Sequence, residues 1–305
     1  MANLMLDGLP VLDLLEVTAD STVVANLLNR HQSAVSRIYR QLSHDLELNF
    51  IKQSNGFYSA SQNHRVLACL REAAQLLRLK NLDRLRWVSG SWNYLLLNSL
   101  DVCPPPLSRG WFGEARTLEL LKTRVLDLAV VSAIDSLPPG TFMDDNSDPH
   151  VFNGIAAFGL GTYPLEVSAH SSHPLIGAQQ LSPEDFSTYP SLAALKGMFY
   201  ERSLLLRSHG LWRTPRRLRS YSWQRWEGES NDGVTLVYTN PISRKILSSS
   251  LEIRPLNYAL DVMDRDVLLV REDLIDVGSI QSLLAIMRKQ YRMKTLELLP
   301  SFGSL

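Results

Sequence analysis

Apolar residues near the start of the chain recur at helical spacing in two short blocks, which a polar break separates. Ala25 and Leu28 lie three positions apart in the first block, and residues 35–46 carry an apolar side chain every three or four positions. Side chains at this spacing share one face of a helix. We therefore predict two amphipathic helices that enclose one small core. The apolar members of the second block are Val35, Tyr39, Leu42 and Leu46.

The second predicted helix has a polar outer face. Its amide, hydroxyl and guanidinium groups are of the kinds that bond base edges and phosphates, and few carboxylates lie beside them. This arrangement indicates a helix-turn-helix, and the alternative is an ordinary antiparallel helix pair with a solvated polar face. The residues of this face are Gln32, Ser33, Ser36, Arg37 and Arg40.

Two further patterns extend this N-terminal unit. Residues 9–17 place leucines and valines among acids and predict a helix that packs behind the pair. Residues 49–60 have β-prone side chains on both sides of Ser54, Asn55 and Gly56, which is a hairpin signal. The hairpin would form a wing, and Lys52 lies on its first strand.

A longer amphipathic helix is predicted after the hairpin, over residues 61–83. Its apolar stripe needs a partner, which is either the same chain or a second subunit. If the partner is a second subunit, Leu70 and Leu77 would lie in the seam between the two copies. The stripe consists of Val66, Leu67, Leu70, Ala73, Ala74, Leu77 and Leu79.

The remaining chain alternates between strand and helix patterns. Residues 85–100 predict a short strand, a turn at Ser89, Gly90 and Ser91, and a helix whose first N–H groups and hydroxyls suit an anion as well as a plain cap. Residues 126–131 form a buried-strand run after another helix pattern. Such alternation predicts a parallel sheet with helices on its faces. A later strand, at residues 160–172, contains Ser168 and His170 near its end.

Three strings resemble the LysR-type transcriptional regulators. Residues 25–43 are similar to the family pattern A-x-x-L-x-x-x-Q-P-A-V-S-R-x-I-R-x-L-E, with Ser33 in place of the proline, Tyr39 in place of the isoleucine and Ser43 in place of the glutamate. Residues 118–131 resemble L-x-x-L-x-x-G-x-L-D-L-A-I-V, with Arg124 replacing the glycine. Residues 173–187 follow the order of the family's H-P-L turn and its capped helix start.

The resemblance implies an α/β protein with a winged helix-turn-helix, a long linker helix and a two-lobe effector domain with the periplasmic-binding-protein fold. The expected boundaries are residues 1–60 for the DNA-binding domain, 61–83 for the linker (dimerisation) helix and 84–305 for the effector-binding domain. Within the latter, lobe I takes residues 84–163 and 262–305, and lobe II takes residues 164–261.

The resemblance also implies a function, namely sequence-specific regulation of transcription. Ser33, Ser36 and Arg37 would contact base edges of a double-stranded operator, beside Gln32, and Arg40 and Lys52 would contact phosphate. The chain would act as a homodimer or homotetramer. A small anionic effector, such as an organic acid, would bind between the lobes, at Ser89, Gly90, Ser91, Ser168 and His170. The alternatives are a ligand-independent regulator with a closed cleft, and a small-molecule-binding α/β protein or enzyme that does not bind DNA.

Composition limits these alternatives. The formal net charge of the 305 residues is zero, so any DNA affinity needs a local patch. No hydrolase elbow, P-loop or dinucleotide fingerprint is present, and we expect neither an enzyme nor a cofactor. Cys69 and Cys103 have no metal-ligand spacing, and His170 and His173 are a weak ligand set. In the local patch, between residues 29 and 65, basic residues outnumber acidic ones. The basic residues are Arg30, Arg37, Arg40, Lys52 and Arg65, and the acidic residues are Asp45 and Glu47.

Two other features concern location and surface. The N-terminus lacks a basic segment, and no apolar run approaches the roughly 18 residues of a spanning helix. We therefore expect a cytoplasmic protein that does not enter membranes. Residues 202–226 interleave arginines with tryptophans, a pattern that fits a solvated face, a subunit contact or a contact with an anionic effector.

Overall fold

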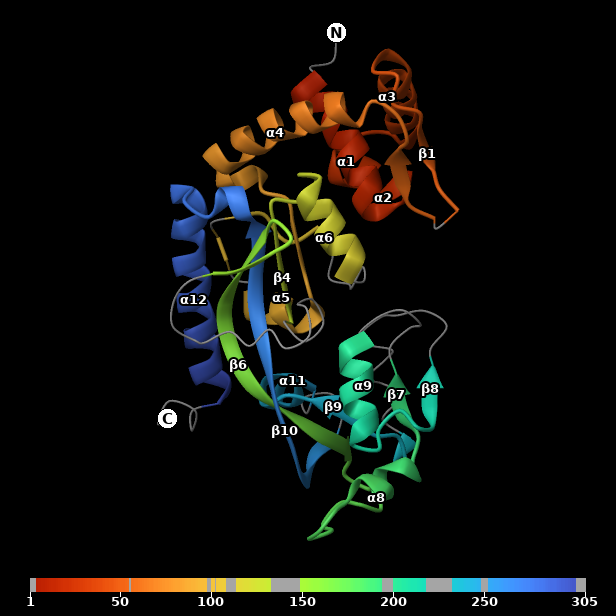
Figure 1. The fold of residues 1–305 in the computed structure, drawn as a ribbon, viewed down its shortest axis with the longest axis vertical. Helices are drawn as coiled ribbons and strands as arrows, with labels where there is room; N and C mark the ends of the chain where they lie inside the picture. The colour runs from red at the N-terminus through yellow and green to blue at the C-terminus, as the bar shows by residue number, and fades with distance from the viewer. Residues whose placement is uncertain are drawn as a thin grey trace.

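The computed structural model describes residues 4–54, 56–97, 100–101, 103–107, 114–132, 149–193, 200–217, 232–247 and 252–299. The helical head and the linker helix lie side by side at one end of the molecule, and the two α/β lobes follow along its long axis (Figure 1). The fold class that we predicted from the sequence is therefore confirmed.

The head is a three-helix unit with a short hairpin. It consists of α1 (Leu9–Thr18), α2 (Ser21–Leu27), α3 (Gln32–Asp45), β1 (Phe50–Lys52) and β2 (Tyr58–Ala60), after a π-helical turn at Leu4–Gly8. The strands pair antiparallel, so the predicted helix pair and hairpin are both confirmed. The core between them buries Leu9, Leu12, Leu15, Val24, Ala25, Val35, Leu48 and Phe50.

Local signals set the ends of these helices. Asp20 caps α2, because its carboxylate accepts hydrogen bonds from the N–H groups of Thr22 (2.7 Å) and Val23 (3.3 Å). These bonds lower the pKa of Asp20. Ala19 ends α1 in the left-handed conformation, and its N–H donates to the carbonyl of Leu15. The connection between α1 and α2 is therefore only two residues long.

The linker helix α4 (His64–Lys80) differs from the expected single apolar stripe. Its inner face is mixed, because Leu67, Ala74 and Leu79 pack on the same chain together with buried polar side chains. Leu70, which we expected in a subunit seam, is partly buried against the head core. A separate outer face carries apolar side chains: Val66 (43% exposed), Leu76 (57%) and Leu77 (54%).

The two lobes share one main sheet. Its described strands lie in the order β3-β4-β10-β6-β5, with β9 also paired to β6. The strands are β3 (Trp87–Ser89), β4 (Leu128–Ser132), β5 (His150–Phe152), β6 (Ile155–His170), β9 (Val237–Thr239) and β10 (Ile253–Arg271). A small parallel pair, β7 (Ser191–Ala193) and β8 (Pro215–Arg217), belongs to lobe II. The helices are α5 (Ser91–Leu97), α6 (Glu114–Lys122), α8 (Pro183–Ser187), α9 (Tyr200–Ser208), α11 (Pro241–Leu247) and α12 (Gly278–Leu298).

The main sheet is mixed, which corrects the expectation of a parallel one. Only β3 and β4 pair parallel among its described strands, whereas β10 runs antiparallel to β4 and to β6. The reason is that β6 carries the chain into lobe II and β10 brings it back, so the two strands lie side by side in opposite directions (Figure 1).

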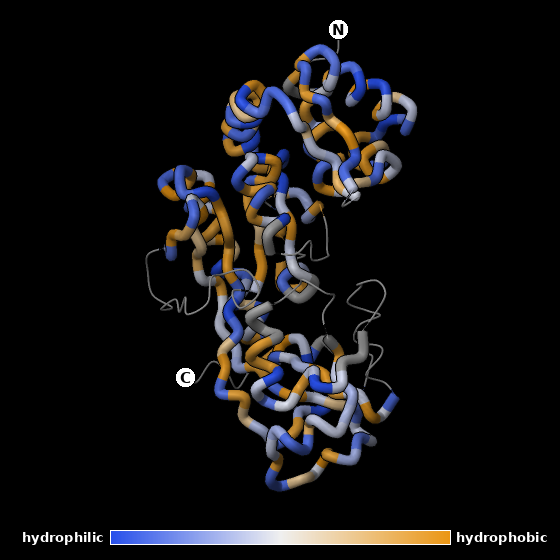
Figure 2. The backbone as a smooth tube through the Cα atoms, turned by 45° about the vertical axis from the view of Figure 1, so that its right-hand side comes forward, coloured by the Kyte–Doolittle hydropathy of each residue, from blue (hydrophilic) through white to orange (hydrophobic). Residues whose placement is uncertain are grey.

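Both faces of the sheet are buried in lobe I. Alternate residues of β4, such as Leu128 and Val130, face α12, while Ala129 and Val131 face α6. Hydrophobic positions accordingly run along these strands without interruption (Figure 2). Lobe II has its own core, which includes Leu165, Val167, Phe186, Leu192, Leu206, Trp212 and Leu236.

Buried charged groups join the head to lobe I. Asp13 of α1 accepts a hydrogen bond from Nε of Arg71 in α4 (2.8 Å) and another from Arg86, which precedes β3. Burial opposes ionisation of this carboxyl, but Arg71, Arg86 and Arg78 outweigh it and hold the pKa of Asp13 below its usual value. Val17 of α1, only 1% exposed, packs in the core of lobe I beside α6.

Candidate nucleic-acid interface

The outer face of α3 forms an open hollow of about 720 Å³. All the residues that we predicted on this face line it, and Arg37 and Arg40 are exposed. Gln41 and His44 extend the same surface by one turn; their spacing of four positions from Arg37 and Arg40 was the available sequence signal. The full lining is Gln32, Ser33, Ser36, Arg37, Arg40, Gln41 and His44.

Hydrogen bonds fix the first turn of this surface. The side-chain amide of Gln32 donates to Oγ of Ser21 (2.9 Å) and approaches Oγ of Ser36 (3.5 Å). Gln32 therefore ties the start of α3 to the start of α2. Arg30, which we counted in the basic patch, forms an ion pair with Asp7 (2.5 Å) and contributes little net charge.

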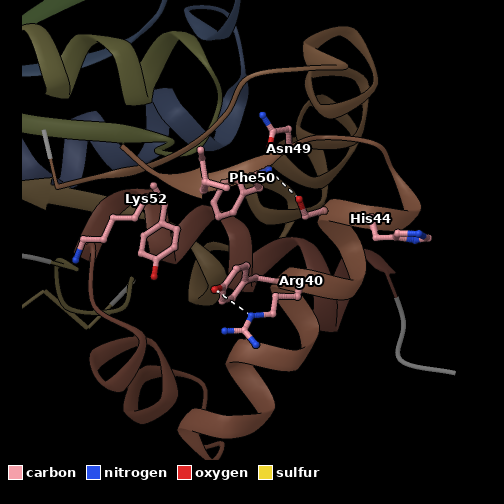
Figure 3. Close-up of a pocket in the computed structure, with 9 residues that line it drawn as sticks. Arg40, His44, Asn49, Phe50 and Lys52 are labelled. Atoms are coloured by element: carbon pink, nitrogen blue, oxygen red, sulfur yellow. Dashed lines mark hydrogen bonds between the residues drawn. The ribbon is translucent and has the colours of Figure 1, made fainter. Parts of the chain in front are cut away.

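A second hollow, of about 410 Å³, lies between α3 and the hairpin (Figure 3). Its floor is aromatic: the rings of Phe50 and Tyr58 stack with centroids 5.7 Å apart, and Tyr39 meets Tyr58 edge-on at 5.7 Å. Arg40 lines both hollows, and its Nε donates to the hydroxyl of Tyr39 (3.4 Å). The guanidinium of Arg40 therefore lies where the two hollows meet.

Lys52 lies at the wing end of the second hollow. Its ammonium donates to the carbonyl of Ala19 (3.2 Å), at the end of α1, and lies 5.8 Å from the centroid of the Tyr58 ring. Among the described residues this is its one hydrogen bond, so two of its three N–H groups can donate to other acceptors. Asn55, at the predicted tip of the wing, lies outside the described residues.

The five residues predicted for the effector site belong to two parts of the fold: Ser89, Gly90 and Ser91 lie at the junction of β3 and α5, and Ser168 and His170 lie near the end of β6. Ser89 is buried at the end of β3, with no hydrogen-bond partner for its hydroxyl among the described residues. The N–H of Gly90 donates to Val130 (3.0 Å), and the side chain of Ser91 lies outside the description. In lobe II, the buried hydroxyl of Ser168 bonds Thr239 (2.8 Å).

His170 is the last residue of β6, the end farthest along the strand from lobe I. Its Nδ1 lies 2.7 Å from Oγ of Ser172 in the turn that follows. His173 shapes this turn, because its Nδ1 accepts from the N–H of Leu175 (3.1 Å) and its Nε2 therefore donates to Val234 (3.1 Å). Burial lowers the pKa of His173.

The other features that we considered from the sequence have less structural support than the surface of α3. Within the described ranges, no group of three or more His, Cys, Asp or Glu side chains is placed to hold a metal. The same part of the chain holds no helix long and apolar enough to span a membrane. Of the arginine- and tryptophan-rich segment, residues 218–226 lie outside the described residues, and Trp212 is buried in the core of lobe II.

Neither a family model nor a curated protein sequence matches the chain. Its winged head, linker helix and two-lobe body are the fold of full-length LysR-type regulators. The chain is similar to full-length OxyR from Pseudomonas aeruginosa, with a TM-score of 0.57, 13% identity and coverage of 96% of this chain and 95% of that one.

Two more solved structures share this fold. A probable transcriptional regulator from Pseudomonas aeruginosa has a TM-score of 0.54 and 18% identity, with 93% of this chain and 94% of that one covered. CbnR, a LysR family transcriptional regulator, has a TM-score of 0.50 and 12% identity, with 94% and 97% covered. CbnR in complex with its target DNA also matches, with a TM-score of 0.51.

Proposed function

We propose that this protein is a sequence-specific DNA-binding transcriptional regulator of LysR type. The observation that carries the proposal is the outer face of α3, where hydroxyl, amide and guanidinium groups line one open hollow beside a wing. A helix of this composition fits the major groove, where such groups pair with base edges. The solved complex of CbnR with its target DNA supports the same use of this fold.

The position of each group suggests its role. Ser33, Ser36 and Arg37 lie on the first two turns of α3, the part of a recognition helix that meets base edges. Arg40 is one turn further on, at the junction of the two hollows, where we place a phosphate. Lys52 would hold a second phosphate from the wing. Gln32, already bonded to Ser21, orients the helix start.

Substitution should separate these roles. Arg37→Ala should cost about 1 to 3 kcal/mol at the preferred duplex and relax the sequence preference, because a base contact is lost. Lys52→Ala should weaken binding to all duplexes alike, because a phosphate contact is lost. The slope of log affinity against log salt concentration should become shallower by about one unit. Fluorescence anisotropy with duplexes selected from a random pool, over a range of salt concentrations, measures both effects.

The matched control is Arg254→Ala, which removes an exposed arginine of lobe II and should leave DNA affinity unchanged. If the unmutated chain shows no salt-dependent affinity for any duplex in the pool, the proposal is wrong. Equal behaviour of the Arg37 and Lys52 variants would contradict the assignment of roles.

We further propose that a second copy of the chain pairs with the outer face of α4. Val66, Cys69, Ala73 and Leu76 are exposed on this face at the alternating spacing of three and four that helix pairs use, and the exposed Leu77 lies beside them. Pairing would place two recognition helices about a two-fold axis, on half-sites about one helical turn or a multiple apart. A homodimer, or a homotetramer built from it, is the assembly that this face supports.

For the effector, we propose a small carboxylic acid held between the lobes, near the start of α5. The hydroxyl of Ser89, which has no partner in the part of the chain that the structure describes, supports a ligand there. The burial of Ser89 and Ser168 favours the alternative, a closed cleft and a regulator without a ligand.

A thermal-shift screen of organic acids distinguishes these two states. A bound acid at 100 times its Kd should stabilise the protein by about 2.7 kcal/mol, and Ser89→Ala should reduce the shift. The exposed residue Ser282 provides the control, since Ser282→Ala should not alter it. If no acid stabilises the unmutated chain at millimolar concentration, the ligand-independent alternative replaces the proposal.

A further inference from the structure

Arg124 occupies an unusual backbone position between α6 and β4. Its φ of 60° lies in the left-handed region, which L side chains rarely adopt, and the LysR-type pattern has glycine at this position. A bulky residue persists there only where its surroundings favour it. The contacts of its side chain, which is 12% exposed, show what those surroundings are.

The guanidinium of Arg124 joins the linker helix to lobe I. Its Nη1 donates to Oε1 of Gln75 in α4 (2.7 Å). Its Nη2 donates to Asp273 in the short helix after β10 (2.6 Å) and approaches Glu72 of α4 (3.3 Å). One side chain therefore bridges two elements that no short segment of chain holds together.

A buried carboxylate continues this bridge inward. Asp127, fully buried at the start of β4, accepts from Nε (2.9 Å) and Nη2 (2.8 Å) of Arg78 in α4. It also accepts from the side-chain amide of Gln75 (3.1 Å) and from the N–H of Arg86 (2.9 Å). Because the amide oxygen of Gln75 accepts from Arg124, the amide nitrogen of Gln75 points toward Asp127.

The head is held at another point as well. Arg116 of α6 donates to the carbonyl of Glu16 in α1 (2.8 Å), and its guanidinium lies 5.0 Å from the centroid of the Phe57 ring in the wing. Together with the contacts of Asp13, these interactions attach α1, α4 and the wing to lobe I.

We propose that Arg124 is an intramolecular latch, which fixes the linker helix and the head to lobe I so that the three move as one rigid body. The latch lies at the edge of the buried contacts, where the linker helix would first separate from the lobe. Its action does not depend on DNA binding, and the proposal can be tested without a known operator.

Arg124→Gly is the informative variant, since glycine fits the left-handed backbone and the turn keeps its shape. In hydrogen exchange on the full chain, amides of residues 71–86 should exchange about tenfold faster in this variant. Local opening then costs less free energy, because the charged hydrogen bonds of Arg124 no longer have to be broken. Trypsin should likewise cleave faster after the exposed residues Lys80 and Arg84.

Arg271→Ala is the matched control. Arg271 also binds Asp273 (2.9 Å), but its other bond goes to the carbonyl of Lys122, within lobe I. The control should leave exchange and cleavage of the 71–86 segment unchanged. Equal exchange in Arg124→Gly and the unmutated chain, or equal acceleration in the two variants, would overturn the latch.

Discussion

Replacing Asp127 by alanine is expected to lower the free energy of unfolding by about 3 to 5 kcal/mol, the largest stability effect that we predict. Asp127 is fully buried and accepts two hydrogen bonds from Arg78, which is itself 5% exposed. Burial alone would lower the pKa of Arg78, but its contacts with Asp127 raise that pKa above its usual value, so the guanidinium is charged. The variant leaves that charge buried without its partner. Urea unfolding of the full chain measures the change.

Two comparisons make the result specific. Asp83→Ala removes an exposed carboxylate close to the same junction and should change stability by less than about 0.5 kcal/mol. Adding Arg78→Met to Asp127→Ala should recover part of the loss, because no unpaired charge then remains. An Asp127→Ala variant as stable as the unmutated chain would show that the buried contacts do not hold the lobe.

Replacing both Leu76 and Leu77 by aspartate is expected to produce monomers and to abolish measurable DNA binding. In a single chain these side chains are 57% and 54% exposed, so the fold should tolerate the change. In a pair of helices they would be buried, and a buried, unpaired carboxylate costs several kcal/mol. DNA affinity should fall when the dimer is lost, since a monomer engages only one half-site. Light scattering and anisotropy on the same samples measure both quantities.

Met293→Asp is the control for this substitution. Met293 is 56% exposed on α12, away from the linker helix, and the variant should keep the assembly of the unmutated chain. A monomeric unmutated chain would refute the proposed assembly. A double variant that still forms dimers would show that another face of the molecule joins the copies.

The head was predictable because its signals are local. The cap of α2, the apolar spacing of α3 and the turn at Gly56 each lie within a few residues of the structure that they determine. The polar hollow on α3 follows from the same spacing, so five of its seven lining residues were predicted from the sequence alone, whereas Gln41 and His44 were missed.

The inner face of α4 was not predictable in the same way. Arg71, Gln75 and Arg78 are polar residues in an amphipathic pattern, which normally places them in solvent. They are buried because Asp13 and Asp127, distant in sequence, lie opposite them. The predicted parallel direction of the strands was wrong for a similar reason, since only the long-range pairing of β6 with β10 determines it.

The effector residues show a third limit. The pattern that suggested an anion site at Ser89 and Ser168 records residue type but not the direction of a hydroxyl. In the structure, Ser168 bonds Thr239 across two strands of lobe II. A serine whose partner lies on another strand cannot be recognised from its own neighbours in the sequence.

The continuity of β6 and β10 determines how the lobes can move. Both strands run unbroken from one lobe into the other, and their pairing shifts register between Pro255 and Ala259 and again between Ala259 and Met263. Such irregularities concentrate twist and bending in a sheet. The lobes are thus connected by one bent, two-stranded ribbon. We expect any movement of one lobe relative to the other to bend or twist this ribbon at its irregular positions.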